Sequence, residues 1–365
     1  MQNRVTELLQ RLTKVIGDAL DRGSKASVES IERVSDDVNT VKMTRVRSDI
    51  DGKREVEATR EGDEAEASQG NPAQAPIHAD SPDQPITGDS DRPTTDPDRP
   101  LRVATWNIAG GRQSRTTEAF DYNEVNLPYF AEQLERVSPD VVCLQESEID
   151  AAGSTAGELA ERLGYPYVFE TAMCPSHIDT SKTLGLAIIS RIPFESTESV
   201  LLPATHLDLR LGGESVTPFD RYAQVAKVAG IDVVNLHPTP LGFFGHSYEE
   251  GAGVADAADI GQTIRSLIDG PGVVAADLNT DRPGVAYGSV FDELNLSPAL
   301  EPGVRTVPGW DGSPDQVYST PDLRATGSRV VPTETDHHLV WGDLDVTDPD
   351  LLARLVAARL GEQRP

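Results

Sequence analysis

Side chains that bind metal ions or phosphate stand at the ends of several apolar, β-like runs in this 365-residue chain. Because the ends of buried strands converge at one edge of a sheet, where sites usually form, we expect these side chains to meet there. Any one of them alone could equally be a capping or turn residue, but that explanation does not suit the whole set. The set comprises Asn107, Glu146, His237, Asp277, Asn279, Asp336 and His337.

These residue types suit the hydrolysis of a phosphodiester, which is anionic and resists attack by hydroxide. A hard divalent cation held by carboxylates neutralises a non-bridging oxygen and the developing charge. A His–Asp pair supplies acid–base capacity near neutral pH, and Asn and His donors stabilise the transition state. Asp277 and His337 are both candidates for the group that deprotonates the attacking water.

Seven segments of the chain resemble, in order, the blocks of the endonuclease/exonuclease/phosphatase superfamily, to which deoxyribonuclease I belongs. They lie within residues 101–345 and read LRVATWNIAGG, VVCLQE, LGLAIISRIP, VVNLHPTP, VVAADLNT, PDQVYST and TETDHHLVW. The resemblance implies a four-layer α/β/β/α sandwich and hydrolysis by in-line attack of water. It also implies dependence on Mg²⁺, with Mn²⁺ as an alternative.

The resemblance also assigns a metal site and a phosphate-binding group. Glu146 matches the principal metal ligand, with Asn107 beside it, and Asp336 matches the carboxylate of the family's Ser-Asp-His block. Asp277 and Asn279 match the Gly-Asp-x-Asn block, which orients the attacking water and the scissile phosphate.

Three further positions complete the catalytic set that the resemblance implies. His337 matches the catalytic histidine, and Asp315 matches the aspartate that supports it. His237 matches a histidine of the deoxyribonuclease and sphingomyelinase branches, where it contacts the phosphate and can protonate the leaving oxygen.

The chain departs from the family pattern at two positions, and a second histidine follows the one that matches the catalytic histidine. Ala276 replaces the glycine before the family's aspartate, and Thr335 replaces the serine of Ser-Asp-His while keeping a hydroxyl. His338 directly follows His337, and adjacent strand residues face opposite sides. Only one of the two can enter the site; we favour His337 and expect His338 to be packed or at the surface.

From residue 101 onward, sequence patterns typical of strands alternate with patterns typical of helices, as in an α/β sandwich. Residues Ala229-Gly230 separate two apolar runs and predict a hairpin. The expected strands are 101–107, 141–145, 184–190, 221–228, 231–236, 272–276, 316–319 and 338–341. The expected helices are 127–137, 156–163, 256–268 and 351–360.

The chain divides into four parts. Residues 1–48 carry apolar rows at helical spacing, and we expect amphipathic helices that either oligomerise, dock to a partner or fold back onto the main domain. Residues 49–100 form an acidic, proline-rich linker that we expect to be disordered. No aromatic residue precedes Trp106, so the core belongs to the catalytic domain, residues 101–346, followed by a C-terminal helix in 347–365.

The formal net charge of −28 disfavours indiscriminate electrostatic binding to nucleic acid. The family resemblance nevertheless favours a nuclease, with hydrolysis of a small or lipid-linked phosphoester as the alternative and a non-catalytic binding module as the second alternative. Arg221 and Arg191 either bind phosphate or form structural ion pairs. The sequence shows no signal peptide or transmembrane stretch, which favours a cytoplasmic protein.

A glycine- and aromatic-rich segment, residues 240–253, follows His237. We expect it to form a loop at the mouth of the site. Phe243, Phe244, His246 and Tyr248 within it either stack on a substrate or pack beneath the loop.

Overall fold

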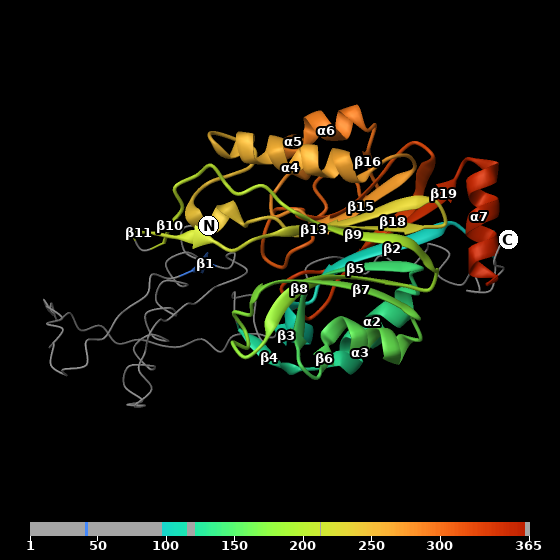
Figure 1. The fold of residues 1–365 in the computed structure, drawn as a ribbon, viewed down its shortest axis with the longest axis horizontal. Coiled ribbons are helices and arrows are strands. Elements are labelled where there is room, and N and C mark those ends of the chain that lie inside the picture. The colour runs from blue at the N-terminus through green and yellow to red at the C-terminus, as the bar shows by residue number, and fades with distance from the viewer. Residues whose placement is uncertain (1–40, 43–96, 115–120, 212, 362–365) are drawn as a thin grey trace, which may run out of the picture.

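The computed structural model describes residues 41–42, 97–114, 121–211 and 213–361. Two large sheets pack face to face, and helices cover the outer face of each, so the described chain forms a four-layer α/β/β/α sandwich (Figure 1). This confirms the fold class expected from the sequence.

The first sheet has the strand order β18-β19-β2-β5-β8-β7, with β6 added beside β5. Its central pair, β2 and β5, is parallel, and the other neighbours are antiparallel. The strands are β2 (Leu101–Asn107), β5 (Val141–Asp150), β6 (Gly153–Ser154), β7 (Tyr167–Pro175), β8 (Thr183–Ser190), β18 (Leu323–Val331) and β19 (Leu339–Val346).

The second sheet has the order β16-β17-β15-β14-β13-β9, and its parallel pair is β14 with β15. Ala229 and Gly230, with φ of 52° and 85°, turn the chain between β13 and β14 and confirm the expected hairpin. The strands are β9 (Phe194–Leu201), β13 (Tyr222–Val228), β14 (Ile231–Leu236), β15 (Gly272–Asp277), β16 (Ser297–Pro298) and β17 (Asp315–Ser319).

Helices cover the two outer faces (Figure 1). On the first sheet lie α2 (Leu127–Val137) and α3 (Thr155–Leu163); on the second lie α4 (Gly253–Leu267), α5 (Pro283–Ala286) and α6 (Gly288–Glu293). Asn126 and Ser154 begin α2 and α3 by accepting hydrogen bonds from the backbone N–H groups of Tyr129 and Gly157. None of the described helices has the length and apolar character needed to cross a membrane.

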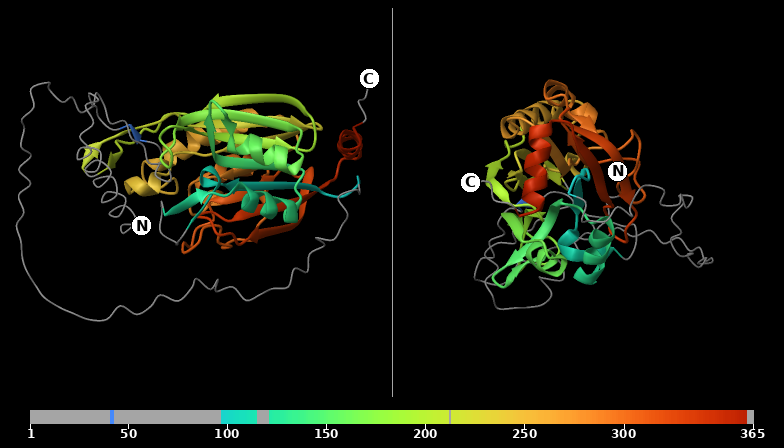
Figure 2. Two further views of the ribbon diagram at one scale, coloured as in Figure 1. Left: turned by 90° about the horizontal axis from the view of Figure 1, so that it is seen from below. Right: turned by 90° about the vertical axis from the view of Figure 1, so that its right-hand side faces the viewer.

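The helix α7 (Pro349–Arg359) closes one end of the sandwich (Figure 2). The guanidinium of Arg359 donates to the carbonyls of Pro97, Arg99 and Pro100 and to the carboxylate of Asp140. Since these acceptors precede β2 and β5, α7 fixes the end of the first sheet opposite to the ends of the strands that carry Asn107 and Glu146.

Short elements connect these layers. The turns η1 (Ala109–Gly111) and η2 (Leu241–Phe244) follow β2 and β14. The two-stranded pairs are β3 (Arg112–Ser114) with β4 (Tyr122–Val125), β10 (Arg210–Leu211) with β11 (Glu214–Ser215), and β1 (Val41–Lys42) with β12 (Thr217–Pro218).

Successive side chains of each strand point to opposite faces of its sheet, so the buried apolar residues form three separate cores. Val233 faces the first sheet, whereas its neighbour Val234 faces the helices α4 and α6. Ile188 likewise lies between the sheets, and Ile189 faces α2 and α3. Each central strand is therefore buried on both faces, which explains its continuous apolar sequence.

Toward one end, the layer between the sheets becomes polar. Gln145 on β5 donates its side-chain N–H to the Asn235 Oδ1 on β14 at 2.7 Å and to the Thr105 hydroxyl at 3.0 Å. Asn235 in turn donates to the Gln224 Oε1 at 3.2 Å and to the carbonyl of Leu144 at 3.1 Å. All of these side chains are buried, so this network fixes one sheet against the other next to the strand ends.

The expected central strands and the helices of residues 101–360 all form, with small shifts at their ends. Three strands at or next to sheet edges, β7, β9 and β18, were not expected, and β19 begins at Leu339 rather than His338. The segments 1–48 and 49–100 lie almost entirely outside the described residues. Within the first, only Val41–Lys42 are described, as the short strand β1, and the helices expected in this segment stay a prediction.

We expect Ile188→Ala to lower the free energy of unfolding by about 2–5 kcal/mol, because it leaves a cavity between the sheets where neighbours cannot collapse. Denaturant titration of the full chain measures this change. Val168→Ala on the adjacent strand β7 is the control, since Val168 is 39% exposed. Equal losses for the two variants would contradict the placement of Ile188 in the inter-sheet core.

Candidate active site

The sheets bring the predicted polar residues to one edge. Asn107 and Asp277 are the last residues of β2 and β15, and His237 directly follows β14. His337 belongs to the segment that enters β19. Both sheets therefore contribute to one cleft, of about 100 Å³, whose lining includes Asn107, His237, Asp277, Asn279, Asp336 and His337.

Glu146 is positioned by an irregular backbone. It has a φ of 56°, a left-handed conformation that costs an ordinary residue about 1–3 kcal/mol. The register between β5 and β8 shifts between Leu144 and Ser147, so Glu146 lies in a bulge that interrupts the ladder. Its fully buried carboxylate accepts a hydrogen bond from the Asn107 side chain at 3.1 Å.

Strong contacts hold the residues after this bulge. The Ser147 hydroxyl accepts from the backbone N–H of Ala156 at the start of α3. The buried Glu148 carboxylate forms ion pairs with Arg112 at 2.8 Å and Lys182 at 3.2 Å and accepts from the Ser176 hydroxyl at 2.9 Å. With Gln145 fixed on the other side, these contacts keep Glu146 in its strained conformation.

Asp277 is the point where the site residues converge. Its Oδ2 lies 3.3 Å from the Asn107 Nδ2, 3.4 Å from the His237 Nε2 and 3.7 Å from the His337 Nδ1. Its Oδ1 accepts from the backbone N–H of Asn279 at 3.0 Å. A single buried carboxylate thus contacts groups from both sheets.

Asn279 is held in a fixed orientation above Asp277. Its φ of 50° is left-handed, which asparagine tolerates better than most residues. Its side-chain N–H donates to the carbonyl of Pro238 at 2.7 Å. Because the side-chain N–H group is committed to Pro238, the orientation of the amide is set before any ligand arrives.

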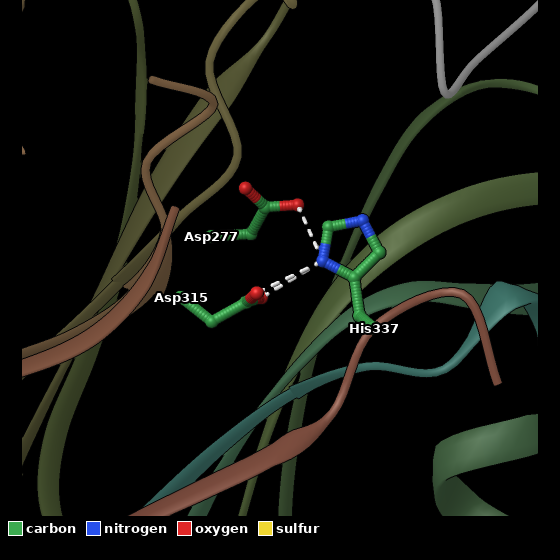
Figure 3. Close-up of side chains that lie close together, drawn as sticks. All are labelled: Asp277, Asp315 and His337. Atoms are coloured by element: carbon green, nitrogen blue, oxygen red, sulfur yellow. Dashed lines mark hydrogen bonds and ion pairs between the residues drawn. The ribbon is translucent and has the colours of Figure 1, made fainter. Parts of the chain in front are cut away.

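His337 is paired with Asp315, as the resemblance implied. Its Nδ1 lies 3.0 Å from the Asp315 Oδ2, and Figure 3 shows Asp277 and Asp315 directed at this same nitrogen while Nε2 points away from both. The Thr306 hydroxyl donates to Asp315 at 2.8 Å. Asp315 therefore orients the ring and leaves Nε2 available for chemistry.

The backbone of His337 is also fixed. Its carbonyl accepts from the Trp106 indole N–H at 3.0 Å, from the Thr333 hydroxyl at 3.0 Å and from the Thr335 hydroxyl. The hydroxyl that Thr335 retains from the family's serine thus has a positioning role. The neighbouring His338 instead accepts at Nδ1 from the backbone N–H of Thr333, which fits the packed position expected for it.

The two site histidines have opposite pKa shifts. Burial lowers the pKa of His337, but Asp315 and Asp277 outweigh that effect and raise it well above 6.5. Burial lowers the pKa of His237 to about 3, and the nearby Asp277 only partly opposes the change. His337 therefore holds a proton more firmly than a free imidazole, and His237 holds one less firmly.

The oxygen-rich groups near Glu146 suit a hard divalent cation. Glu146 and Asp277 are buried carboxylates bridged by the Asn107 amide; Asp277, Asn107 and Asp336 line the cleft, whereas Glu146 is not among the lining residues. Asp336 accepts at Oδ2 from the Tyr122 hydroxyl, whereas its buried Oδ1 has no hydrogen-bond partner among the described residues. Buried carboxylates together with an unpaired oxygen are what Mg²⁺ or Mn²⁺ would require.

Asp277, Asp315 and His337 also lie close enough to share an ion, with their ligand atoms within 4.8 Å of one another. Asp315 is completely buried and already accepts from Thr306 and His337. Since Mg²⁺ keeps several waters, this enclosed position suits an acid–base pair better than a magnesium site.

Neither Arg191 nor Arg221 is among the residues that line the cleft. The guanidinium of Arg191 lies over the ring of Tyr165 and donates to the carbonyl of Pro139, which is a structural role. Arg221 is buried behind the cleft and lines a smaller pocket with Asp256 and Thr205. Direct phosphate binding by Arg191 is therefore not supported by its position.

Sequence reasoning missed several residues that shape the site. Gln145, Asn235 and Gln224 are polar residues inside apolar strands, a signal that their side chains meet a buried partner. Trp310 lies in an irregular segment shortly before Asp315 and lines the cleft. Tyr122, which contacts Asp336, has no local pattern that could have identified it.

The fold is an α/β sandwich with a cleft at one edge, in which a buried aspartate pairs with a histidine. Residues 104–337, well over half of the chain, match the profile of the Endonuclease/Exonuclease/phosphatase family, and the chain belongs to that family. None of the curated proteins matches the chain in sequence.

Solved structures share the fold at low identity. The endonuclease/exonuclease/phosphatase from Beutenbergia cavernae is similar with a TM-score of 0.54 and 21% identity over 68% of this chain and 72% of that chain. The human Nocturnin catalytic domain gives 0.47 and 21% over 68% and 94%. An AP endonuclease from Archaeoglobus fulgidus gives 0.45 and 17% over 67% and 100%.

Asp315→Asn is expected to lower the pKa of His337, because it removes a negative charge 3.0 Å from Nδ1. Proton NMR titration of the metal-free protein measures the shift, and the exposed His206, paired with Asp259, is an internal control that keeps its pKa. An unchanged His337 pKa would show that the pair does not set its charge.

The same pairing has a consequence for stability. Because the folded-state pKa of His337 lies above the unfolded value of about 6.5, protonation stabilises the fold below that pH. We expect this contribution to be lost as the pH rises through the folded-state pKa, and to be smaller in Asp315→Asn. Denaturant titrations across this pH range provide the measurement.

Proposed function

We propose that the protein is a divalent-metal-dependent hydrolase that cleaves a phosphodiester by in-line attack of water. The observation that carries this proposal is the convergence on Asp277 of Asn107, His237 and His337, drawn from both sheets into one cleft. Together with family membership, this geometry provides the metal ligands and the acid–base pair that such a reaction needs.

Glu146, Asn107 and Asp336 would hold the ion in this proposal. When bound, Mg²⁺ or Mn²⁺ neutralises a non-bridging phosphate oxygen and the charge that develops on it. Glu146 is suited to this because its carboxylate is buried and its backbone is fixed by the bulge. The strained conformation presents the ligand without reorganisation on binding.

The two histidines take different roles because their charges differ. His337, cationic and oriented by Asp315, places a proton at Nε2, where it stabilises the anionic phosphate and donates to the leaving oxygen. His237 is neutral and buried, so it donates a hydrogen bond and is not expected to act as an acid. This modifies the leaving-group role that the resemblance implied for His237.

Asp277 receives the proton of the attacking water in this scheme. His337 is protonated in the metal-free protein and is therefore a poor base, whereas the Asp277 carboxylate is directed into the cleft. The amide of Asn279, locked by Pro238, orients the water or the phosphate beside it. Each of these contacts is in place without a conformational change.

Glu146→Gln and His337→Ala are each expected to reduce kcat by about 10²–10⁴-fold. Hydrolysis is measured with Mg²⁺ on plasmid DNA, RNA, sphingomyelin and inositol phosphates side by side. Glu158→Gln, on the exposed face of α3, is the matched control that keeps full activity. If the wild type is no faster than the Glu146→Gln, His337→Ala double variant, the chain is not this enzyme, and the binding-module alternative gains support.

Removal of the metal provides a second test that does not require the physiological substrate. We expect EDTA to abolish hydrolysis and added Mg²⁺ or Mn²⁺ to restore it. Titration calorimetry should show Mn²⁺ bound by the wild type and by Glu158→Gln, with affinity reduced at least about 10-fold in Glu146→Gln. Equal affinities would place the ion elsewhere.

A further inference from the structure

One wall of the catalytic cleft is apolar, and it comes from two segments next to catalytic residues in sequence. The first segment follows His237 and contributes Leu241 and Phe243; the second precedes Asp315 and contributes Val307 and Trp310. Phe243 and Trp310 are only half-buried, so their rings retain open surface beside the reacting groups.

This wall is built before any ligand binds. The turn η2 is held by the Tyr248 hydroxyl, which donates to the carbonyl of Thr239 at 2.7 Å, and Phe244 packs into the core beneath. On the other segment, a Cβ at Gly312 would lie 3.1 Å from a ring carbon of Trp310. The backbone therefore closes tightly against the indole, and the aromatic surface is preformed.

The charges around the cleft do not favour a polyanion. No lysine or arginine of the described chain lines it, whereas Asp281 does. The arginines nearby in sequence, Arg282 and Arg305, form exposed ion pairs with Glu249 and Asp311 and do not line the cleft. Proteins that bind nucleic acid neutralise several backbone phosphates with such cations, and this cleft offers none beyond the catalytic histidine.

The size of the space limits the group that can occupy it. The cleft measures about 100 Å³, and part of that volume must hold the phosphate. An apolar cavity of about 150 Å³ accepts one benzene ring. The space left beside the phosphate is smaller than such a cavity, so it admits at most a single ring or a short alkyl chain that lies against the wall with one side open to solvent.

We propose that the wall formed by Leu241, Phe243, Val307 and Trp310 is a subsite for one uncharged, apolar ester group of a small phosphodiester. The inference rests on the proposed function and narrows its substrate class to a phosphate carrying a planar ring or short chain, in place of a polynucleotide. Apolar contact with the wall selects the substrate, while Asp281 and the absence of lining cations exclude further phosphates.

The test uses phosphonates at alkaline pH, where each of them carries two negative charges, and none of them contains an ester bond that could be hydrolysed. Calorimetry with MgCl₂ compares phenylphosphonate, butylphosphonate and methylphosphonate with a ten-residue oligothymidylate. We expect phenyl- or butylphosphonate to bind about 10-fold more tightly than methylphosphonate, because only they bury apolar surface on the wall. Comparison of phenylphosphonate with butylphosphonate shows whether the wall prefers a ring or an alkyl chain. The oligonucleotide should bind more weakly than either.

Variants of the wall residues test whether tighter binding of the apolar phosphonates depends on this wall. Trp310→Ala should remove the roughly 10-fold advantage of phenylphosphonate and leave methylphosphonate unchanged. Phe243→Ala gives the same comparison if the first variant does not fold, and Val285→Ala, an exposed position on α5, is the control. Equal affinity for the three phosphonates, equal losses in Trp310→Ala, or tightest binding of the oligonucleotide would overturn the proposal.

Failure of this inference and failure of the proposed function give different results. Phosphonate affinity is measured without turnover. A chain that prefers phenylphosphonate through Trp310 but hydrolyses no ester contradicts the hydrolase and retains the subsite. A chain that hydrolyses phosphodiesters without any apolar preference retains the hydrolase and contradicts the subsite.

Discussion

The hydrogen bond between Gln145 and Asn235 joins the two sheets immediately behind the cleft. Glu146 follows Gln145 on one sheet, and His237 lies two residues beyond Asn235 on the other. Any sliding of the sheets would separate these groups and leave buried amides unpaired, at a cost of about 1–3 kcal/mol for each group. The hydrogen bonds between the sheets thus fix the distances around Asp277, where side chains from both sheets meet.

Burial gives the acidic groups of the site their chemical character. Glu146, Asp277 and Asp315 are withdrawn from water; the Asn107 amide contacts the first two, and the His337 ring lies against the last two. His237 is more deeply buried than His337 and lacks its close contact with Asp315, and its pKa moves in the opposite direction. Two residues of one type therefore have pKa values shifted in opposite directions because their environments differ.

The central strands were predictable because each is buried on both faces and reads as a continuous apolar run. The strands β7 and β9 were missed because they are sheet edges with one exposed face. In β9, Phe194–Leu201, most side chains are exposed, so its sequence FESTESVL carries no apolar run. Hydrogen bonding to β13 forms this strand, and such a contact has no local signature.

The sequence by itself determined the family, the order of the buried strands and the polar residues at their ends, because these depend on patterns within a few residues. The tertiary structure decided the rest. It placed Arg191 against Tyr165 instead of the cleft, put Glu146 in a strained bulge and shifted the pKa values of the two site histidines in opposite directions. Each outcome depends on burial and on partners far away in the chain, and only the folded packing of both sheets specifies these.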